Sequence, residues 1–197
     1  MPLDALSAAL ASREPLGAGG GGTRAAVSLL LHGAEADSHV ELLFIERSRH
    51  DGDPWSGHLA FPGGKVEATD VDPRAAAARE TREEVGIELA SIADFIGQLD
   101  DQSASIRPMT ISGFVYGARA SPPPLVLGDE VEDAFWFPLH ELADPTRQTW
   151  HLDKRSGSKY AAIDLRLPQV PLLWGVTYRL VVELLRLAGL NSPRRIQ

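Results

Sequence analysis

The stretch Gly63–Ile87 reads GGKVEATDVDPRAAAARETREEVGI, and it decides the fold that we predict for this chain. It indicates one central helix over Pro73–Val85, because proline is favoured at the first helical position. An aspartate before that position, Asp72 or Asp70, can cap the helix, and Gly86 predicts its end. The glycine pair at the start of the stretch predicts a turn that leads toward the helix.

Three glutamates on this helix are the candidate catalytic and metal-binding residues. Glu80, Glu83 and Glu84 stand at spacing i, i+3, i+4, so a helix places their carboxylates on one face. A cation would neutralise their mutual repulsion, and hard oxygen ligands favour Mg²⁺ or Mn²⁺. The alternative is a solvated acidic helix face, which the glycine pair, the arginine and the closing Gly86-Ile87 in register disfavour.

The residues around the glutamates predict how the carboxylates are held. We expect Ala75–Ala78 on the opposite helix face, where small side chains allow close packing on a sheet. Arg79 can hold a carboxylate in a bidentate pair, and Asp70 lies near the helix N-terminus. Gly63 and Gly64 permit close backbone approach and leave a carbonyl free to face a metal ion.

Apolar runs on both sides of this stretch predict the strands of a sheet. They are Ala25–Leu31, Val40–Glu46 and Leu59–Phe61 before the helix, and Ile92–Leu99, Thr110–Tyr116 and Ala134–Phe137 after it. A short helix from Leu139, a hairpin within 150–164 and an amphipathic helix over Thr177–Leu187 follow. This order predicts an α/β protein, a sandwich with helices on the faces of a mixed sheet.

The domain organisation follows from the ends of the chain. Residues 3–14 predict a short amphipathic helix, and Gly19–Gly22 predicts a flexible joint after it. We therefore expect an N-terminal helix and glycine-rich segment over 1–24, one domain over 25–190 and a C-terminal tail over 191–197.

Composition excludes several classes of function. The 197 residues are 44% hydrophobic, which suits one globular domain with a real core. With 27 acidic and 19 basic residues the formal charge is -8, which disfavours nucleic acid as a partner. Without cysteine, any metal needs oxygen or imidazole ligands. No stretch is long enough to span a bilayer and the N-terminus has no signal-peptide pattern, so we expect a cytoplasmic protein without membrane partners.

The stretch 63–87 resembles the Nudix box, G-x5-E-x7-R-E-U-x-E-E-x-G-U, where U is an aliphatic residue. The positions that match are Gly64, Arg79, Glu80, Glu83, Glu84, Gly86 and Ile87. The resemblance implies a Nudix-type α/β/α sandwich and a hydrolase of phosphoanhydride bonds in a small nucleotide substrate. It also implies that the three glutamates and the Gly63 carbonyl hold Mg²⁺ or Mn²⁺, and that Arg79 belongs to the catalytic set.

The stretch departs from the box in three ways, and these departures in part resemble the box of the coenzyme A pyrophosphatase subgroup. Asp70 stands where Glu is usual, eight residues rather than seven separate it from Arg79, and Thr81 occupies the aliphatic position. The subgroup's box carries an acid, two residues, an Asp and one extra residue before Arg-Glu, and Glu67–Asp70 (EATD) fits that form.

Flanking segments also resemble this subgroup. Leu43–Ser48 (LFIERS) approximates L-L-T-x-R-S, Gly57–Gly64 (GHLAFPGG) fits G-x3-F-P-G-G, and Trp174–Thr177 (WGVT) looks like the subgroup's C-terminal end. The arginine expected between the first two segments is absent: Gly52 or Asp53 stands near its place, and the spacing is one residue longer. The altered loop over 49–56 therefore leaves the substrate open.

Several residues outside the helix are candidates for roles in the reaction. One glutamate of the set, or a distal acid in the loop before the Ala134–Phe137 strand, would accept the proton from water. The distal candidates are Glu130 and Glu132, and the alternative for both is a solvated loop acid.

Candidate substrate-binding residues are Arg47, Trp55, His58, Gly64 and Asp70. Arginine suits phosphate and an indole ring suits adenine. A surface salt bridge for Arg47 and sheet packing for Trp55 are the alternatives. The other three tryptophans, at 136, 150 and 174, are expected in the core.

The sequence thus favours a pyrophosphohydrolase acting on coenzyme A or an acyl-coenzyme A, which gives 3',5'-ADP and (acyl-)phosphopantetheine. ADP-ribose, dinucleotides and nucleoside triphosphates are alternative substrates. A non-catalytic nucleotide-binding regulatory module is a further alternative, which the intact Glu80, Glu83 and Glu84 set disfavours. The final helix could serve a homodimer or cover the sheet of a monomer.

Overall fold

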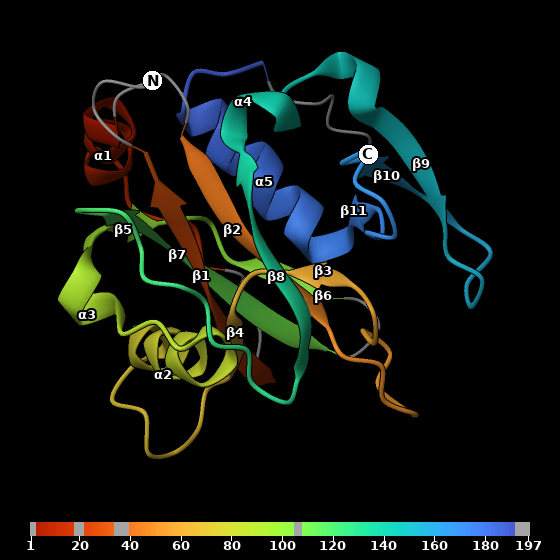
Figure 1. Cartoon of the computed structure of the whole chain (residues 1–197), viewed down its shortest axis with the longest axis horizontal. Helices are drawn as coiled ribbons and strands as arrows, with labels where there is room; N and C mark the ends of the chain where they lie inside the picture. Colours follow the sequence, from red (N-terminus) through yellow and green to blue (C-terminus); the bar gives the residue numbers. More distant parts are fainter. Residues whose placement is uncertain (1–2, 18–21, 34–39, 105–107, 192–197) are drawn as a thin grey trace.

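A computed structural model describes residues 3–17, 22–33, 40–104 and 108–191 of the chain. Figure 1 shows a twisted sheet between two layers of helices, with α2 and α3 on one side and α1 and α5 on the other. The predicted α/β/α sandwich with a mixed sheet is confirmed.

The elements follow the expected order with a few additions. In chain order they are α1 (Leu3–Ala11), β1 (Thr23–His32), β2 (Glu41–Arg47), β3 (Leu59–Ala60), β4 (Gly63–Lys65), α2 (Pro73–Val85), α3 (Leu89–Ile92), β5 (Ala93–Gln98), β6 (Gln102–Ala104), β7 (Met109–Ala118), β8 (Val131–Pro138), α4 (Leu139–Leu142), a 3-10 turn (Pro145–Arg147), β9 (Gln148–Leu152), β10 (Lys159–Ile163), β11 (Leu173–Trp174) and α5 (Gly175–Leu187).

The main sheet has the strand order β3-β2-β1-β7-β5, with β4 paired to β1, β6 to β7 and β8 to β2. Only the β1–β7 pair among the described strands is parallel, and the other pairs are antiparallel. A second, three-stranded sheet of β9, β10 and β11 lies at one end of α5, on the right of Figure 1. The hairpin expected within 150–164 is confirmed as part of this small sheet.

Side chains of β1 alternate between the two cores because successive strand residues point to opposite faces. Leu29 and Leu31 pack into the core that α1 and α5 cover, whereas Ala26 and Leu30 pack into the core under α2. Ser28 faces α2 too, and its hydroxyl donates to the Ala77 carbonyl at 3.2 Å. The sheet face under α2 is therefore mainly apolar, and Ser28 adds a buried hydroxyl that bonds to the helix.

The central helix begins and ends as predicted. The Asp72 carboxylate accepts from the Ala75 amide at 2.7 Å, and Gly86 closes the helix at φ 72°. Thr81, in the position that the motif reserves for an aliphatic residue, is fully buried and donates to the Ala77 carbonyl at 2.7 Å. A threonine is tolerated there because its hydroxyl finds this acceptor within the same helix.

The expected separation of the alanines and the glutamates onto opposite faces of α2 is wrong. Ala76 and Ala77 are fully buried, and Glu84 is buried with them. The reason is the helical repeat, since Ala76 and Glu84 lie two steps of four residues apart on the same row, with Glu80 between them. Burial under the sheet thus extends onto one of the three carboxylates.

The N-terminal helix packs as part of the domain. Leu6 and Leu10 are buried in the larger core, and the Arg13 guanidinium pairs with Asp100 and Glu183. Most of the glycine run expected as a joint and nearly all of the expected tail lie outside the described residues. Among the described residues no helix is both long and apolar enough to cross a membrane.

One core prediction is wrong for a tryptophan of the small sheet. Trp150 is 52% exposed, and its neighbour Leu152 on the same face of β9 is 53% exposed. The β9–β10 hairpin projects beyond the body of the domain in Figure 1, and about half of each of these two side chains stays exposed. Trp174 and Trp136 are partly buried.

Candidate active site

Strand β4 brings the glycine pair against the C-terminal half of α2. Its pairing with β1 places Gly63 opposite Val27, and the Gly63 amide donates to the Glu84 carboxylate at 2.8 Å. A Cβ on Gly63 would lie 2.3 Å from the Ala26 carbonyl oxygen, so the close backbone approach requires glycine. The predicted turn at this pair is instead a short strand, because β1 offers it an edge to pair with.

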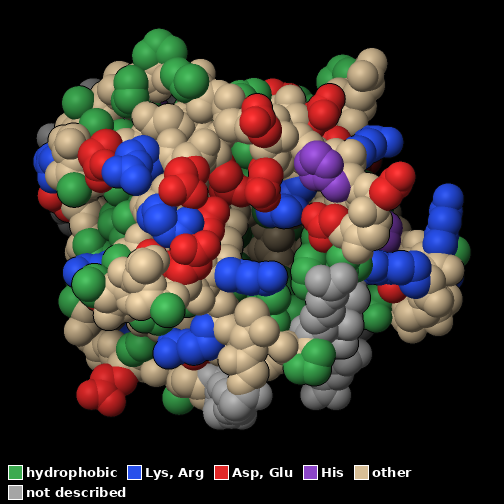
Figure 2. Space-filling model, turned by 90° about the horizontal axis from the view of Figure 1, so that it is seen from below, with side chains coloured by type: hydrophobic (Ala, Val, Ile, Leu, Met, Phe, Trp, Pro, Cys, Tyr) green, Lys and Arg blue, Asp and Glu red, His purple; other side chains and the backbone are tan. Residues whose placement is uncertain are grey.

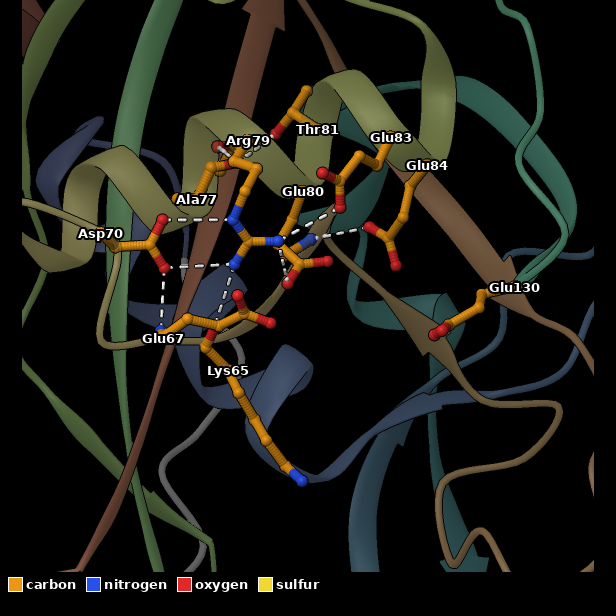
Figure 3. A network of polar contacts seen from close by, with 12 residues as sticks. Lys65, Glu67, Asp70, Ala77, Arg79, Glu80, Thr81, Glu83, Glu84 and Glu130 are labelled. Atoms are coloured by element: carbon orange, nitrogen blue, oxygen red, sulfur yellow. Dashed lines mark hydrogen bonds and ion pairs between the residues drawn. The ribbon is translucent and has the colours of Figure 1, made fainter.

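Arg79 organises the polar residues beneath the helix, as Figure 3 shows. Its guanidinium donates to both Asp70 oxygens, at 3.1 and 3.2 Å, which confirms the expected bidentate pair. Nη1 also donates to Glu80 at 2.9 Å and to Glu83 at 3.1 Å. The hydrogen bond from Arg79 holds the pKa of Asp70 below its ordinary value. Asp70 thus fixes the arginine, and the arginine fixes two glutamates.

Glu84 is the most deeply buried carboxylate of the set. One of its oxygens accepts from the Gly63 amide, while Oε1 is buried without a hydrogen-bond partner in the structure. Burial raises the pKa of Glu84 to about 8, the Gly63 hydrogen bond and nearby Arg47 lower it, and Glu80 and Glu130 raise it. A carboxylate in this position lacks a positive partner close enough to offset its desolvation.

Glu80 and Glu83 lie on the same side of α2 with different exposure. The Glu80 side chain is 19% exposed, and burial raises its pKa, while Glu83 is 52% exposed. A Cβ on Gly64 would lie 2.3 Å from the Glu80 carboxylate, so glycine at this position leaves the space that the carboxylate fills.

The residues fit a hard divalent cation, although the described residues hold no ready-made cluster of three ligands. Arg79 pairs with both Glu80 and Glu83, whereas Glu84 Oε1 has no hydrogen-bond partner and lies 3.9 Å from the nearest Arg47 nitrogen. Figure 2 shows acidic side chains gathered at the centre of the molecular face that it draws, beside a hollow. Oxygen ligands of this kind suit Mg²⁺ or Mn²⁺ once a substrate phosphate adds further oxygens.

Arg47 connects the glutamates to the loop over 48–58. Its guanidinium lies 3.9 Å from Glu84, 3.7 Å from Glu130 and 3.3 Å from Asp53. The alternative of an isolated surface salt bridge does not describe this residue, because its side chain is only 25% exposed and contacts three acids. Arg47 is thus placed between the candidate metal ligands and the loop.

The two candidate distal acids are separated by the structure. Glu130 faces α2 across the gap in Figure 3, and its charge contributes to the raised pKa values of Glu80 and Glu84. Glu132 lies within β8 rather than in a loop, and its charge acts on Glu46. The difference arises because β8 begins at Val131, one residue after Glu130.

His58 and Trp55 belong to the loop over 48–58, which Arg47 contacts through Asp53. His58 packs on Trp174 with ring centroids 4.9 Å apart, in an open pocket of about 650 Å³ between the 52–58 loop and the small sheet. The Trp55 amide donates to Asp53 at 3.1 Å, and its side chain is partly buried. The pocket also includes His151, Lys154 and Arg155, which sequence reasoning missed. No local spacing pointed to them, since they reach the site only through the fold.

The three-layer sandwich with an acid-bearing helix against its sheet defines the fold class, and comparison with known proteins identifies the family. The model of the NUDIX domain matches residues 22–156, which is more than half of the chain. The chain therefore belongs to the NUDIX family, and the resemblance found in the sequence is confirmed.

Curated relatives match parts of their own length. An uncharacterized protein of Schizosaccharomyces pombe is 40% identical over 55% of this chain and 35% of its own length. A peroxisomal coenzyme A diphosphatase of Mus musculus is 32% identical over 45% of this chain and 37% of its length. A mitochondrial coenzyme A diphosphatase of Homo sapiens is 29% identical over 78% of this chain and 66% of its own length. The chain thus spans about a third of the length of the first relatives it matches.

A solved structure shows the same fold. The Ap4A hydrolase of Caenorhabditis elegans in a binary complex superposes with a TM-score of 0.50 at 22% identity, over 61% of this chain and 82% of that one. At this identity the similarity supports the fold alone.

Proposed function

We propose that this chain is a divalent-cation-dependent pyrophosphohydrolase that cleaves a nucleoside-diphosphate-linked substrate. The observation that carries the proposal is the buried Glu84 carboxylate, which has one oxygen without a hydrogen-bond partner and two further glutamates on the same side of α2. Natural proteins rarely bury an uncompensated carboxylate, and such groups gather at functional sites. Membership of the NUDIX family supports the same activity.

Each residue of the site has a proposed role. Glu80, Glu83 and Glu84 would hold the cation together with the Gly63 carbonyl, and a bound cation would neutralise the pyrophosphate and acidify a water. Asp70 and Arg79 position these carboxylates. Arg47 would bind substrate phosphate, because its guanidinium lies between Glu84 and the loop over 48–58.

Glu130 is the proposed proton acceptor. Its side chain is 71% exposed and faces the glutamates across the gap, so a water attacking the phosphate could reach it. Glu132 is not part of this arrangement, since it lies along β8 beside Glu46. We choose this distal acid over one of the three glutamates because Glu130 is exposed. A glutamate that binds a cation would also be a weaker base.

The first candidate substrate is coenzyme A or an acyl-coenzyme A, cleaved to 3',5'-ADP and (acyl-)phosphopantetheine. Two coenzyme A diphosphatases among the relatives and the sequence form of the box support this choice. ADP-ribose, dinucleotides and nucleoside triphosphates are the rival substrates.

A substrate panel tests the proposal. Product release from coenzyme A, ADP-ribose and a nucleoside triphosphate is measured by chromatography with Mg²⁺, with Mn²⁺ and with a chelator. We expect the highest kcat/KM with coenzyme A and no turnover with the chelator. Faster cleavage of a rival substrate would overturn the choice of coenzyme A but not the pyrophosphohydrolase activity. No turnover of any of the three substrates would favour a nucleotide-binding regulatory module.

A further inference from the structure

The pocket between the 52–58 loop and the β9–β10 hairpin adjoins the candidate active site without sharing its glutamates. Asp53 belongs to the pocket lining and lies 3.3 Å from Arg47, whose other amino group lies 3.9 Å from Glu84. One arginine side chain therefore separates the pocket from the carboxylates. A substrate whose phosphates lie at the glutamates would reach the pocket with the group attached to them.

One wall of the pocket is built of aromatic rings. His151 stacks on Trp174 with centroids 3.9 Å apart and planes 17° apart, and His58 packs on the same indole at 4.9 Å. Burial lowers the pKa of both histidines, which favours the neutral form of each imidazole. Neutral planar rings of this kind suit a nucleobase, which stacks on aromatic faces.

The rim of the pocket carries positive charge in an otherwise acidic protein. Lys154 and Arg155 lie in the turn of the hairpin, and Arg155 donates to the Pro54 carbonyl at 3.0 Å, which joins the hairpin to the loop. The two acids of the lining are already engaged: Asp153 accepts from the Arg155 and Ser156 side chains, and Asp53 pairs with Arg47.

Lys154 is the rim cation available to a ligand. It is exposed, and within the described part of the chain no acid lies in ion-pairing distance of its ammonium group. A lysine ammonium is a compact donor that suits a phosphate group.

We infer that this pocket receives the nucleoside half of the substrate, with the base against the His58, His151 and Trp174 wall and a phosphate on the ribose at Lys154. The inference rests on the proposed function in its choice of ligand, because the nucleoside is the one joined to the pyrophosphate at the glutamates. The neutral, flexible pantetheine half has no group that pairs with the cations at the pocket rim. We therefore assign it to the side of the glutamates that faces away from the pocket.

Binding measurements test the inference without any turnover. Calorimetry with Mg²⁺ compares ribose 5-phosphate, adenosine 5'-phosphate and adenosine 3',5'-bisphosphate, each of which adds one group to the one before. We expect the base to raise affinity and the 3'-phosphate to raise it by about a further tenfold, the strength of one charged hydrogen bond. Equal affinities for the last two ligands would overturn the assignment of Lys154.

Variants on the same hairpin complete the test. In Lys154→Ala the tenfold preference for the bisphosphate is expected to disappear, while Lys159→Ala, which removes an equal charge from an exposed site outside the pocket, keeps it. An equal loss in both variants would show only a general charge effect and would contradict the inference. Hydrolysis of dephospho-coenzyme A, which lacks the 3'-phosphate, is expected to be the same in the wild type and in Lys159→Ala. If the wild type did not hydrolyse dephospho-coenzyme A, that result would count against the proposed function and not against the assignment of the pocket.

Discussion

Two buried glutamates in this protein have opposite surroundings. Glu183 of α5 is 3% exposed, and its carboxylate accepts from the Arg13 guanidinium at 2.9 Å and from the Asp100 amide at 2.9 Å. Glu84 of α2 is 4% exposed, and it has one amide partner, an unpartnered oxygen and an arginine no closer than 3.9 Å. The fold compensates the first charge from within the chain, whereas the second has only the more distant Arg47, and this difference supports the proposed cation site.

The comparison predicts that Glu84→Gln has the largest effect on activity. The amide keeps the shape of the side chain but not its charge, so hydrolysis is expected to fall about 10³-fold. The free energy of unfolding should change by less than about 1 kcal/mol, because burial already raises the pKa of this carboxyl to about 8 and disfavours its charge without a cation. Kinetics with Mg²⁺ and denaturant unfolding measure both, and full activity would refute the metal-site role.

Gly64→Ala sharpens the comparison by moving a neighbour of Glu84 without adding or removing charge. The new methyl group would lie 2.3 Å from the Glu80 carboxylate, so that side chain must move. A displaced ligand is expected to lower kcat by about 10²-fold, with a change in unfolding free energy below about 1 kcal/mol.

The matched control for this variant is Gly63→Ala. Its methyl group meets the Ala26 carbonyl oxygen at 2.3 Å, which is backbone and cannot move aside, so we expect a loss of stability of about 1–3 kcal/mol. Thermal unfolding distinguishes the two variants. Equal destabilisation by both would show that Gly64 serves packing rather than the placement of Glu80.

Glu183→Gln is the counterpart on the other side of the sheet. It removes the charge that pairs with Arg13, and the expected cost is about 2 kcal/mol in unfolding free energy, the value of a charged hydrogen bond. Activity per folded molecule should be unchanged, since α5 packs on the face away from α2. A fall in kcat without a fall in stability would break the distinction between the two glutamates.

Much of the site could be predicted because its signals are local. The bounds of α2, its aspartate cap, its glycine end and a bidentate pair from Arg79 to a carboxylate all depend on residues within one short stretch, and the structure identifies that carboxylate as Asp70. Helix geometry alone places the three glutamates near one another. The order of apolar runs similarly predicted the mixed α/β sandwich.

The sequence could not show which glutamate is buried or which distal acid faces it. Burial of Glu84 depends on where the sheet meets α2, and the choice of Glu130 over Glu132 depends on the residue at which β8 starts. The exposure of Trp150 was also missed, because its apolar strand extends past the elements that could cover it.

The sequence by itself determined the family, the central helix and the acids of the proposed site, since these follow from spacing along a single element. Tertiary structure alone decided that one buried oxygen of Glu84 has no hydrogen-bond partner, that Arg47 joins Glu84 to the loop over 48–58, and that Lys154 and His151 line a pocket beside that loop. The physical reason is distance along the chain. Contacts between residues about a hundred positions apart are set by how whole elements pack, and no local pattern records them.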